Sequence, residues 1–331
     1  MDILSNNVIT YDCIRASVEI TAEELKSFIV KNGDILFQRS SETLEDVGRA
    51  NVYMDDKPAV FGGFVIRGKK KSEYNPLFFK YLLATPYARR KIIPMGAGAQ
   101  HFNIGQEGLS KVKLYFPILQ EQHKIASLLQ LIDERISTQN KIIEKLQSLI
   151  KGIAQHCIKE STSGNAYVKL GDICQITTGK LDANAKVDNG IYPFFTCAER
   201  PFKIDSFAFD TEALLISGNG ANLGYINYYN GKFNAYQRTY VLDIFSENIQ
   251  YIKWALKVLL PKRIAIEKSS SNTPYIVLST LSNLRLPIPN KSNQCHIAKL
   301  MQSLERKLSS QIALNGFYNK LKQYLLRQMF I

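Results

Sequence analysis

The sequence repeats itself. When the chain is shifted by 172 residues, residues 109–158 align with residues 281–330 without a gap, and 12 of the 50 pairs are identical. The identical pairs include Pro117/Pro289, Gln122/Gln294, Ile125/Ile297, Ala126/Ala298 and Gln139/Gln311. Self-similarity of this kind indicates a tandem duplication. We therefore expect the 331-residue chain to fold as two related halves.

Each copy ends in a pattern typical of a long helix, which follows a strand that a proline ends: KLYFP before Ile118 and RLPIP before Asn290. Apolar residues in the first helix recur at alternating spacings of four and three, as in an a/d heptad seam. A helix of about 40 residues is about 60 Å long, so we expect the two seams to form a rigid antiparallel coiled coil. Gln139 and Gln311 share a seam position and either set the register or face solvent. The expected interface comprises Ile125, Leu129, Ile132, Ile136, Ile143, Leu146, Ile150 and Ile153 with Ile297, Met301, Leu304, Leu308 and Leu325.

A region of mixed strand and helix pattern precedes each long helix. Strands are predicted from Gly33 (GDILFQ), Ala59 (AVFGGFVIRG) and Ala213 (ALLISG), and helices over roughly 76–91 and 249–262. The pair Asn230–Gly231 predicts a type I′ hairpin between aromatic strands. The polar loops that follow the helices differ, GAGAQHFN from Gly96 and SSSNTPY from Ser269. Similar scaffolds with different loops suit two copies that read different ligands.

Composition favours a soluble protein with a polyanionic partner. The formal net charge is +13, from 42 basic and 29 acidic residues, which is compatible with nucleic acid but does not identify it. No apolar run approaches the ~20 residues that cross a bilayer, and the amino terminus carries no secretion signal. We therefore expect a cytoplasmic protein without membrane contact. The five cysteines form no CxxC pair and predict neither a metal site nor a disulfide framework.

Two motifs were tested for an enzymatic interpretation. NPLF at residues 75–78 resembles the NPPY/F signature of adenine-N6 methyltransferases, but the second proline and a glycine-rich FxGxG element are missing. The simpler interpretation is that Asn75 caps a helix opened by Pro76. The loop SGNGANLG, residues 217–224, lacks nucleotide-binding spacing and is either a tight turn or a loop whose amides read adenine edges. The scattered histidines predict no hydrolytic triad, so no catalytic residue is expected.

Basic clusters recur at equivalent places in the two copies. Arg90 and Lys91 align with Lys262 and Arg263 at the 172-residue offset. Such clusters either compensate a helix dipole or contact phosphates and fix a protein on DNA, while loop side chains read bases. The expected phosphate contacts are Lys69, Lys70, Lys71, Arg89, Arg90, Lys91, Lys262 and Arg263. The expected base-reading residues are Asn219, Asn222, Gln237, Arg238 and Asn272.

Two variable modules, each followed by a long helix entered through P-x-x-x-x-Q-x-x-I-A, resemble the DNA specificity subunit of type I restriction-modification systems. KLGDICQITTGK from Lys169, GKFNAYQRTYVL from Gly231 and QEQHKIASLLQLIDERI from Gln120 carry the resemblance. The resemblance implies a noncatalytic subunit that reads two DNA half-sites and binds no cofactor itself. It also implies partner modification subunits that methylate adenine with S-adenosylmethionine, and restriction subunits that use ATP and magnesium.

The predicted fold class is α+β, with two similar α/β target-recognition domains separated by two long helices. The expected divisions are a first recognition domain over 1–117, a spacer helix over 118–160, a second recognition domain over 161–289 and a spacer helix over 290–331. The second module opens at Lys169, but the first shows no counterpart of KLGDI. We therefore expect the first domain to be truncated at its amino end, so that it is incomplete or takes its opening strand from elsewhere in the assembly. A coiled-coil scaffold and a DNA adenine methyltransferase are the alternative functions.

Overall fold

The computed structural model describes residues 2–161, 166–267 and 275–330, which form two compact units. The first unit comprises Met1–Lys141 and Ile312–Ile331, and the second comprises Ile142–Gln311. Each unit therefore contains a part of both long helices, α6 (Leu119–Glu160) and α9 (Lys291–Gln328). The predicted divisions at the helix ends stay a prediction.

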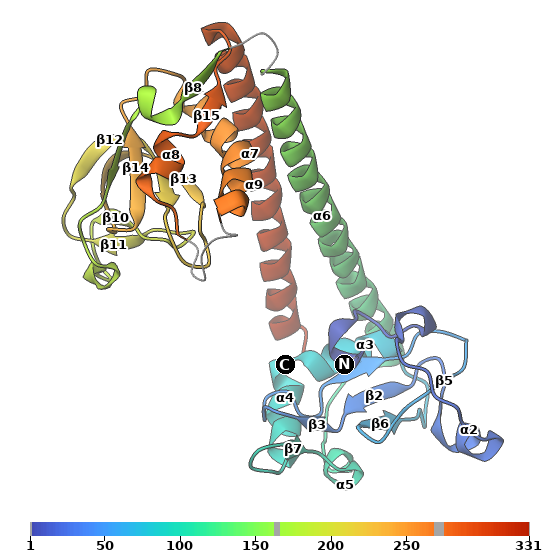
Figure 1. Ribbon diagram of the computed structural model, residues 1–331. Helices are drawn as coiled ribbons and strands as arrows, with labels where there is room; N and C mark the ends of the chain where they lie inside the picture. Colours follow the sequence, from blue (N-terminus) through green and yellow to red (C-terminus); the bar gives the residue numbers. More distant parts are fainter. Residues whose placement is uncertain (1, 162–165, 268–274, 331) are drawn as a thin grey trace. The chain divides into compact units, whose positions relative to one another are not determined.

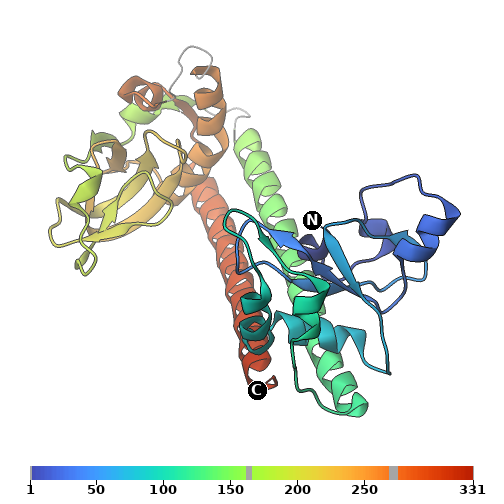
Figure 2. The ribbon, with the colours of Figure 1, turned by 90° about the horizontal axis from the view of Figure 1, so that it is seen from below.

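The first unit is built on small antiparallel sheets. The order β4-β2-β6 forms a three-stranded sheet, and β1–β5 and β3–β7 form two short pairs. The strands and the helices α3 and α4 can be followed in Figure 2. The elements before α6 are α1 (Asp2–Ser5), η1 (Tyr11–Cys13), α2 (Ala22–Phe28), β1 (Ile29–Val30), β2 (Ile35–Gln38), β3 (Ser40–Ser41), β4 (Ala50–Val52), β5 (Ala59–Val60), β6 (Val65–Gly68), α3 (Pro76–Ala84), α4 (Pro86–Ile92), η2 (Ile93–Met95), β7 (Phe102–Asn103) and α5 (Gln106–Ser110).

The second unit contains a six-stranded sheet of order β11-β10-β13-β12-β14-β9 and a separate pair, β15–β8. Helix α7 lies between this sheet and α9 (Figure 1), and its two sides contribute to two apolar clusters. The elements between the long helices are β8 (Tyr167–Lys169), η3 (Leu170–Asp172), β9 (Gln175–Thr178), η4 (Ala183–Ala185), β10 (Tyr192–Phe195), β11 (Phe202–Ile204), β12 (Phe209–Ser217), β13 (Ile226–Ala235), β14 (Thr239–Asp243), α7 (Ile249–Glu267), α8 (Leu278–Ser282) and β15 (Arg285–Pro287).

The long helices pack antiparallel within the first unit. Asp133 of α6 pairs with Lys322 of α9 at 2.5 Å, and Asn140 accepts a hydrogen bond from Asn315 at 2.9 Å. In the second unit Ile150 and Ala154 of α6 share an apolar cluster with residues of α7 and α9. The residues predicted for the two seams are all buried or half-buried, because residues at a and d positions lie on one stripe of a helix.

The predicted hairpin at Asn230–Gly231 is wrong. Strand β13 runs through this pair, where Asn230 lies opposite Glu212 and Gly231 opposite Thr211 of β12. The turn between the two strands lies instead at residues 218–225, where Gly220 and Gly224 adopt positive φ angles. Pairing of β13 with β12 along its length therefore overrides the local turn preference of the Asn-Gly pair.

Three other predicted elements differ in extent. The predicted helix over 76–91 is two helices, because Thr85 ends α3 and its side chain caps α4, with Pro86 at the first turn. The predicted strand from Ala59 is divided into β5 and β6. The segment KLYFP, residues 113–117, contains no strand, whereas the equivalent Arg285–Pro287 pairs with β8. A strand needs a partner, and among the described residues the first unit supplies none here.

Candidate nucleic-acid interface

A buried glutamine clamps each recognition module to its long helix. In the first unit Gln122 Oε1 accepts from the backbone N–H of Asn75 at 3.0 Å, and its Nε2 donates to Pro117 O at 2.9 Å. Asn75 in turn caps α3, because its side chain accepts from Phe78 N. The same geometry, with the same two distances, recurs in the second unit at Gln294, Asn248 and Pro289. The structure thus supports the helix-cap interpretation of NPLF.

A buried carboxylate makes a second attachment at equivalent positions of the two units. Asp133 of α6 accepts from the Tyr81 hydroxyl at 2.8 Å and lies 3.7 Å from Lys80 Nζ. Burial lowers the pKa of Lys80 to about 8, although Asp133 opposes that shift. The equivalent carboxylate, 172 residues later, is paired with two lysines of α7 at 2.7 and 3.2 Å: Glu305 with Lys253 and Lys257. Each module is therefore held to the helices by a polar clamp and an ion pair.

Four connections between elements of the second unit are joined by hydrogen bonds into one surface, here called the loop cluster. Gly218 N donates to Arg238 O at 2.8 Å, and Gln237 N donates to Leu181 O at 2.9 Å. A Cβ atom on Gly218 would lie 2.5 Å from Arg238 O, so only glycine permits this approach. The loop cluster comprises residues 179–182, 196–201, 218–225 and 236–238.

Asn219 and Asn222 hold the loop cluster together. The Cys197 thiol donates to Asn219 Oδ1 at 3.0 Å, and Asn222 Nδ2 donates to Cys197 O at 3.0 Å. Both asparagines are half-buried. The structure thus gives these amides a structural role, which competes with the predicted reading of bases.

Gln237 and Arg238 are exposed at the turn between β13 and β14. Two further exposed basic residues of the loop cluster, Lys180 and Arg200, were missed by sequence reasoning. Their proximity to Arg238 depends on strand pairing, and the sequence offers only isolated basic residues as a signal. The loop cluster therefore presents long cationic and amide side chains above a hydrogen-bonded base, which is suited to contacts with phosphates and base edges.

The basic cluster of α4 divides into one outward residue and two inward ones. Arg89 donates to Glu45 O and Val47 O, at 2.8 and 2.6 Å. Its burial lowers the pKa of its guanidinium. Lys91 donates to the Tyr87 hydroxyl and to Lys113 O, at 3.2 and 2.8 Å. These contacts show structural roles for both residues, whereas Arg90 is exposed.

The remaining predicted cations are exposed. Lys69, Lys70 and Lys71 follow β6, and Lys70 pairs with Glu73 at 3.1 Å. Lys262 and Arg263 are not at a helix end, because α7 continues to Glu267. Their phosphate contacts stay predictions. Asn272 lies outside the described residues.

Neither a metal centre nor a membrane span is evident in the part of the chain that the structure describes. In residues 2–161, 166–267 and 275–330, no three His, Cys, Asp or Glu side chains gather as metal ligands would. Over the same residues, every helix is too short or too polar to span a bilayer.

Comparison with known proteins identifies the family. The family described as "Type I restriction modification DNA specificity domain" matches residues 1–148 and again 162–314. The EcoDI type I restriction enzyme specificity subunit of Escherichia coli is 41% identical over 143 residues, which are 43% of this chain and 32% of that protein. This chain thus matches about a third of that relative's length.

Two solved structures share the fold. A type I restriction-modification S subunit from M. genitalium gives a TM-score of 0.63 at 19% identity, covering 92% of this chain and 84% of the other. A structure reported for complex assembly and conformational transition of the type I R-M system gives 0.56 at 18% identity, covering 91% and 82%. With the family matched twice across two recognition domains, the chain belongs to the type I restriction-modification DNA specificity subunits.

Proposed function

We propose that this chain reads a bipartite, asymmetric DNA site through its two recognition domains. The observation that carries the proposal is the repetition of one attachment geometry with different loops. Each module is held to α6 or α9 by the same glutamine clamp, at Gln122 and Gln294, while the surfaces beyond the clamp differ in sequence and fold. Shared attachment favours a common docking geometry, and different loops favour different half-sites.

We further propose that the chain is noncatalytic and recruits the subunits that act on DNA. Methyl transfer to adenine would use S-adenosylmethionine bound by modification subunits, and cleavage would use ATP and magnesium bound by restriction subunits. Membership of the specificity-subunit family supports this division of labour. The fold shared with a protein solved to explain complex assembly of the type I R-M system is consistent with it. The complex would act on genomic DNA in the cytoplasm.

Methylation mapping tests the proposal. The chain is expressed together with its modification subunits in a host that lacks them, and N6-methyladenine is mapped across the genome. We expect one gapped motif with two unlike halves. The Arg238→Ala variant should relax one half only, because Arg238 belongs to the second unit alone. An ungapped motif, or methylation without this chain, would contradict the proposal.

A binding measurement separates the alternatives. If the assembly recognises DNA through this chain, affinity for a duplex should fall steeply with salt, and a duplex with the mapped motif should bind more tightly than a scrambled one. A scaffold would show no preference between the two duplexes. A methyltransferase would bind S-adenosylmethionine as the isolated chain, which isothermal titration calorimetry would detect.

A further inference from the structure

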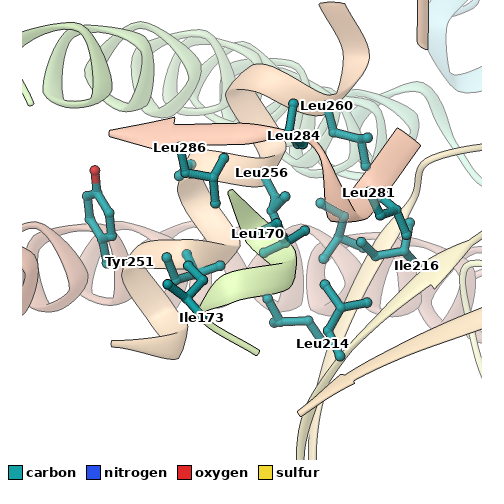
Figure 3. Packing of buried hydrophobic residues seen from close by; sticks show 14 of the residues in the cluster. Leu170, Ile173, Leu214, Ile216, Tyr251, Leu256, Leu260, Leu281, Leu284 and Leu286 are labelled. Carbon is teal, nitrogen blue, oxygen red and sulfur yellow. The ribbon is translucent and has the colours of Figure 1, made fainter. Parts of the chain in front are cut away.

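In the second unit, one short segment completes the core. Strand β8 pairs antiparallel with β15, and the ladder is extended by Leu170 N donating to Leu284 O at 2.9 Å. Leu170 is fully buried and Ile173 is 6% exposed. Figure 3 shows both side chains among the leucines of α7, α8 and β15. The segment Tyr167–Cys174 thus supplies both a strand and two apolar side chains that fill the core.

The first unit has a cavity where these side chains would lie. Its volume is about 330 Å³. Six of its wall residues align with core residues of the second unit: Phe79/Ile252, Leu83/Leu256, Ile92/Ile264, Leu109/Leu281, Val112/Leu284 and Leu114/Leu286. The first two pairs are counted from the equivalent helix caps, and the other four lie 172 residues apart. Strand β2 adds Ile35 and Phe37 to the wall, as β12 adds Leu214 and Ile216 in the second unit. The cavity is thus lined like the site that receives Leu170 and Ile173.

An extended backbone edge borders the cavity. On one side, Lys113 O accepts from Lys91 Nζ at 2.8 Å, and Tyr115 N donates to the Tyr87 hydroxyl at 2.9 Å. On the other side, the backbone groups of Leu114 and Phe116 have no hydrogen-bond partner among the described residues. Tyr115 is 82% exposed and Phe116 is 54% exposed. This edge is therefore held straight on one side and is open to a strand on the other.

We propose that the first unit binds an extended segment of a different polypeptide chain by strand addition. The segment pairs with Val112, Leu114 and Phe116, and it inserts two aliphatic side chains spaced three residues apart into the cavity, as Leu170 and Ile173 do in the second unit. The exposed Lys69 and Lys71 at the cavity rim favour an acidic residue between them, at the place of Asp172. Backbone pairing supplies affinity, and the two apolar side chains supply specificity.

A second copy of this chain is a poorer donor. Its own segment of this type, Tyr167–Cys174, already fills the second unit, and its release would uncover Leu170 and Ile173. The proposal stands on the comparison of the two units and does not depend on DNA recognition.

A labelled peptide tests the proposal on the full chain. The probe is a fluorescein-labelled peptide of residues 166–174 with Cys174→Ser, and the control peptide carries Leu170→Asp and Ile173→Asp. Fluorescence anisotropy should show saturable binding of the probe, and binding at least about tenfold weaker for the control, because charged side chains cannot enter the apolar cavity. A third peptide, methylated on the Leu170 amide nitrogen, should also bind more weakly, since it loses one ladder hydrogen bond.

Hydrogen exchange locates the binding site without relying on a variant. The probe should slow exchange at the amides of Leu114 and Phe116 and leave the second unit unchanged. The cavity-filling variant Val112→Phe, if circular dichroism shows that it folds, should lose probe binding. Equal binding of probe and control, or protection elsewhere, would overturn the proposal. Self-association of the wild-type chain that Val112→Phe abolishes would show that a second copy is the occupant, and would overturn it as well.

Discussion

Replacement of Asp133 by asparagine tests how the first recognition module is held to its helices. The Asp133 side chain is 7% exposed and lies near Lys80, whose side chain is 13% exposed. The variant keeps the size of the side chain but removes the charge that compensates Lys80. Loss of one partner of a buried ion pair costs about 3–5 kcal/mol. We expect a loss at the lower end of this range, since Lys322, which also pairs with Asp133, is 24% exposed and can turn to solvent.

The pH dependence of stability provides an independent check. Burial holds the pKa of Lys80 at about 8, below its ordinary value of 10.5. Between these values the unfolded chain binds more protons than the folded chain, so this residue makes the free energy of unfolding rise with pH. Asp133→Asn removes a charge that raises the pKa of Lys80. The rise should therefore begin at a lower pH in the variant.

Hydrogen exchange of α3 measures the effect in the correct unit, because the single tryptophan, Trp254, lies in the second unit. The amides of α3 should exchange faster in Asp133→Asn, and urea unfolding should shift to lower concentration. The double variant Lys80→Met with Asp133→Leu should recover much of the loss, as apolar replacements of buried pairs do. Glu305→Gln is the matched control and should affect α7 instead. A loss below about 1 kcal/mol for Asp133→Asn would refute the buried-pair reasoning.

Three further predictions follow from the second unit. Gln294→Ala should lower the free energy of unfolding by about 2–3 kcal/mol, since it leaves Asn248 N and Pro289 O without partners, and should speed exchange at the Asn248 amide. Leu170→Ala should cost about 2–5 kcal/mol in urea unfolding because it opens a cavity in a fully buried site; an unchanged midpoint would contradict the packing in Figure 3. Arg238→Ala should change stability by less than about 0.5 kcal/mol yet alter the methylated motif, whereas Asn222→Ala should lower the melting temperature. The reverse pattern would show that Asn222, and not Arg238, reads DNA.

The repeat and the helical seams could be predicted because they are local properties of the chain. A seam requires only that apolar residues recur at heptad spacing, and a helix cap such as Asn75 acts on amides three residues away. The break at Thr85–Pro86 was equally local, and a threonine before a proline signals a cap and a first helical turn. The loop cluster was not predictable in this way, because residues 179–182 and 236–238 meet only after β9 has paired with β14.

Local preference and tertiary pairing disagree most clearly at Asn230–Gly231 and at residues 113–117. An Asn-Gly pair favours a turn, but pairing along the whole of β12 makes it part of a strand. Lys113–Phe116 has the sequence of a strand and adopts an extended form, yet no partner among the described residues completes it. The sequence by itself therefore determined the duplication, the long helices and the family, all of which rest on residue spacing. Tertiary structure decided which amides are consumed inside the fold, which cations remain exposed and where a strand lacks its neighbour, since these depend on hydrogen bonds between segments far apart in the chain.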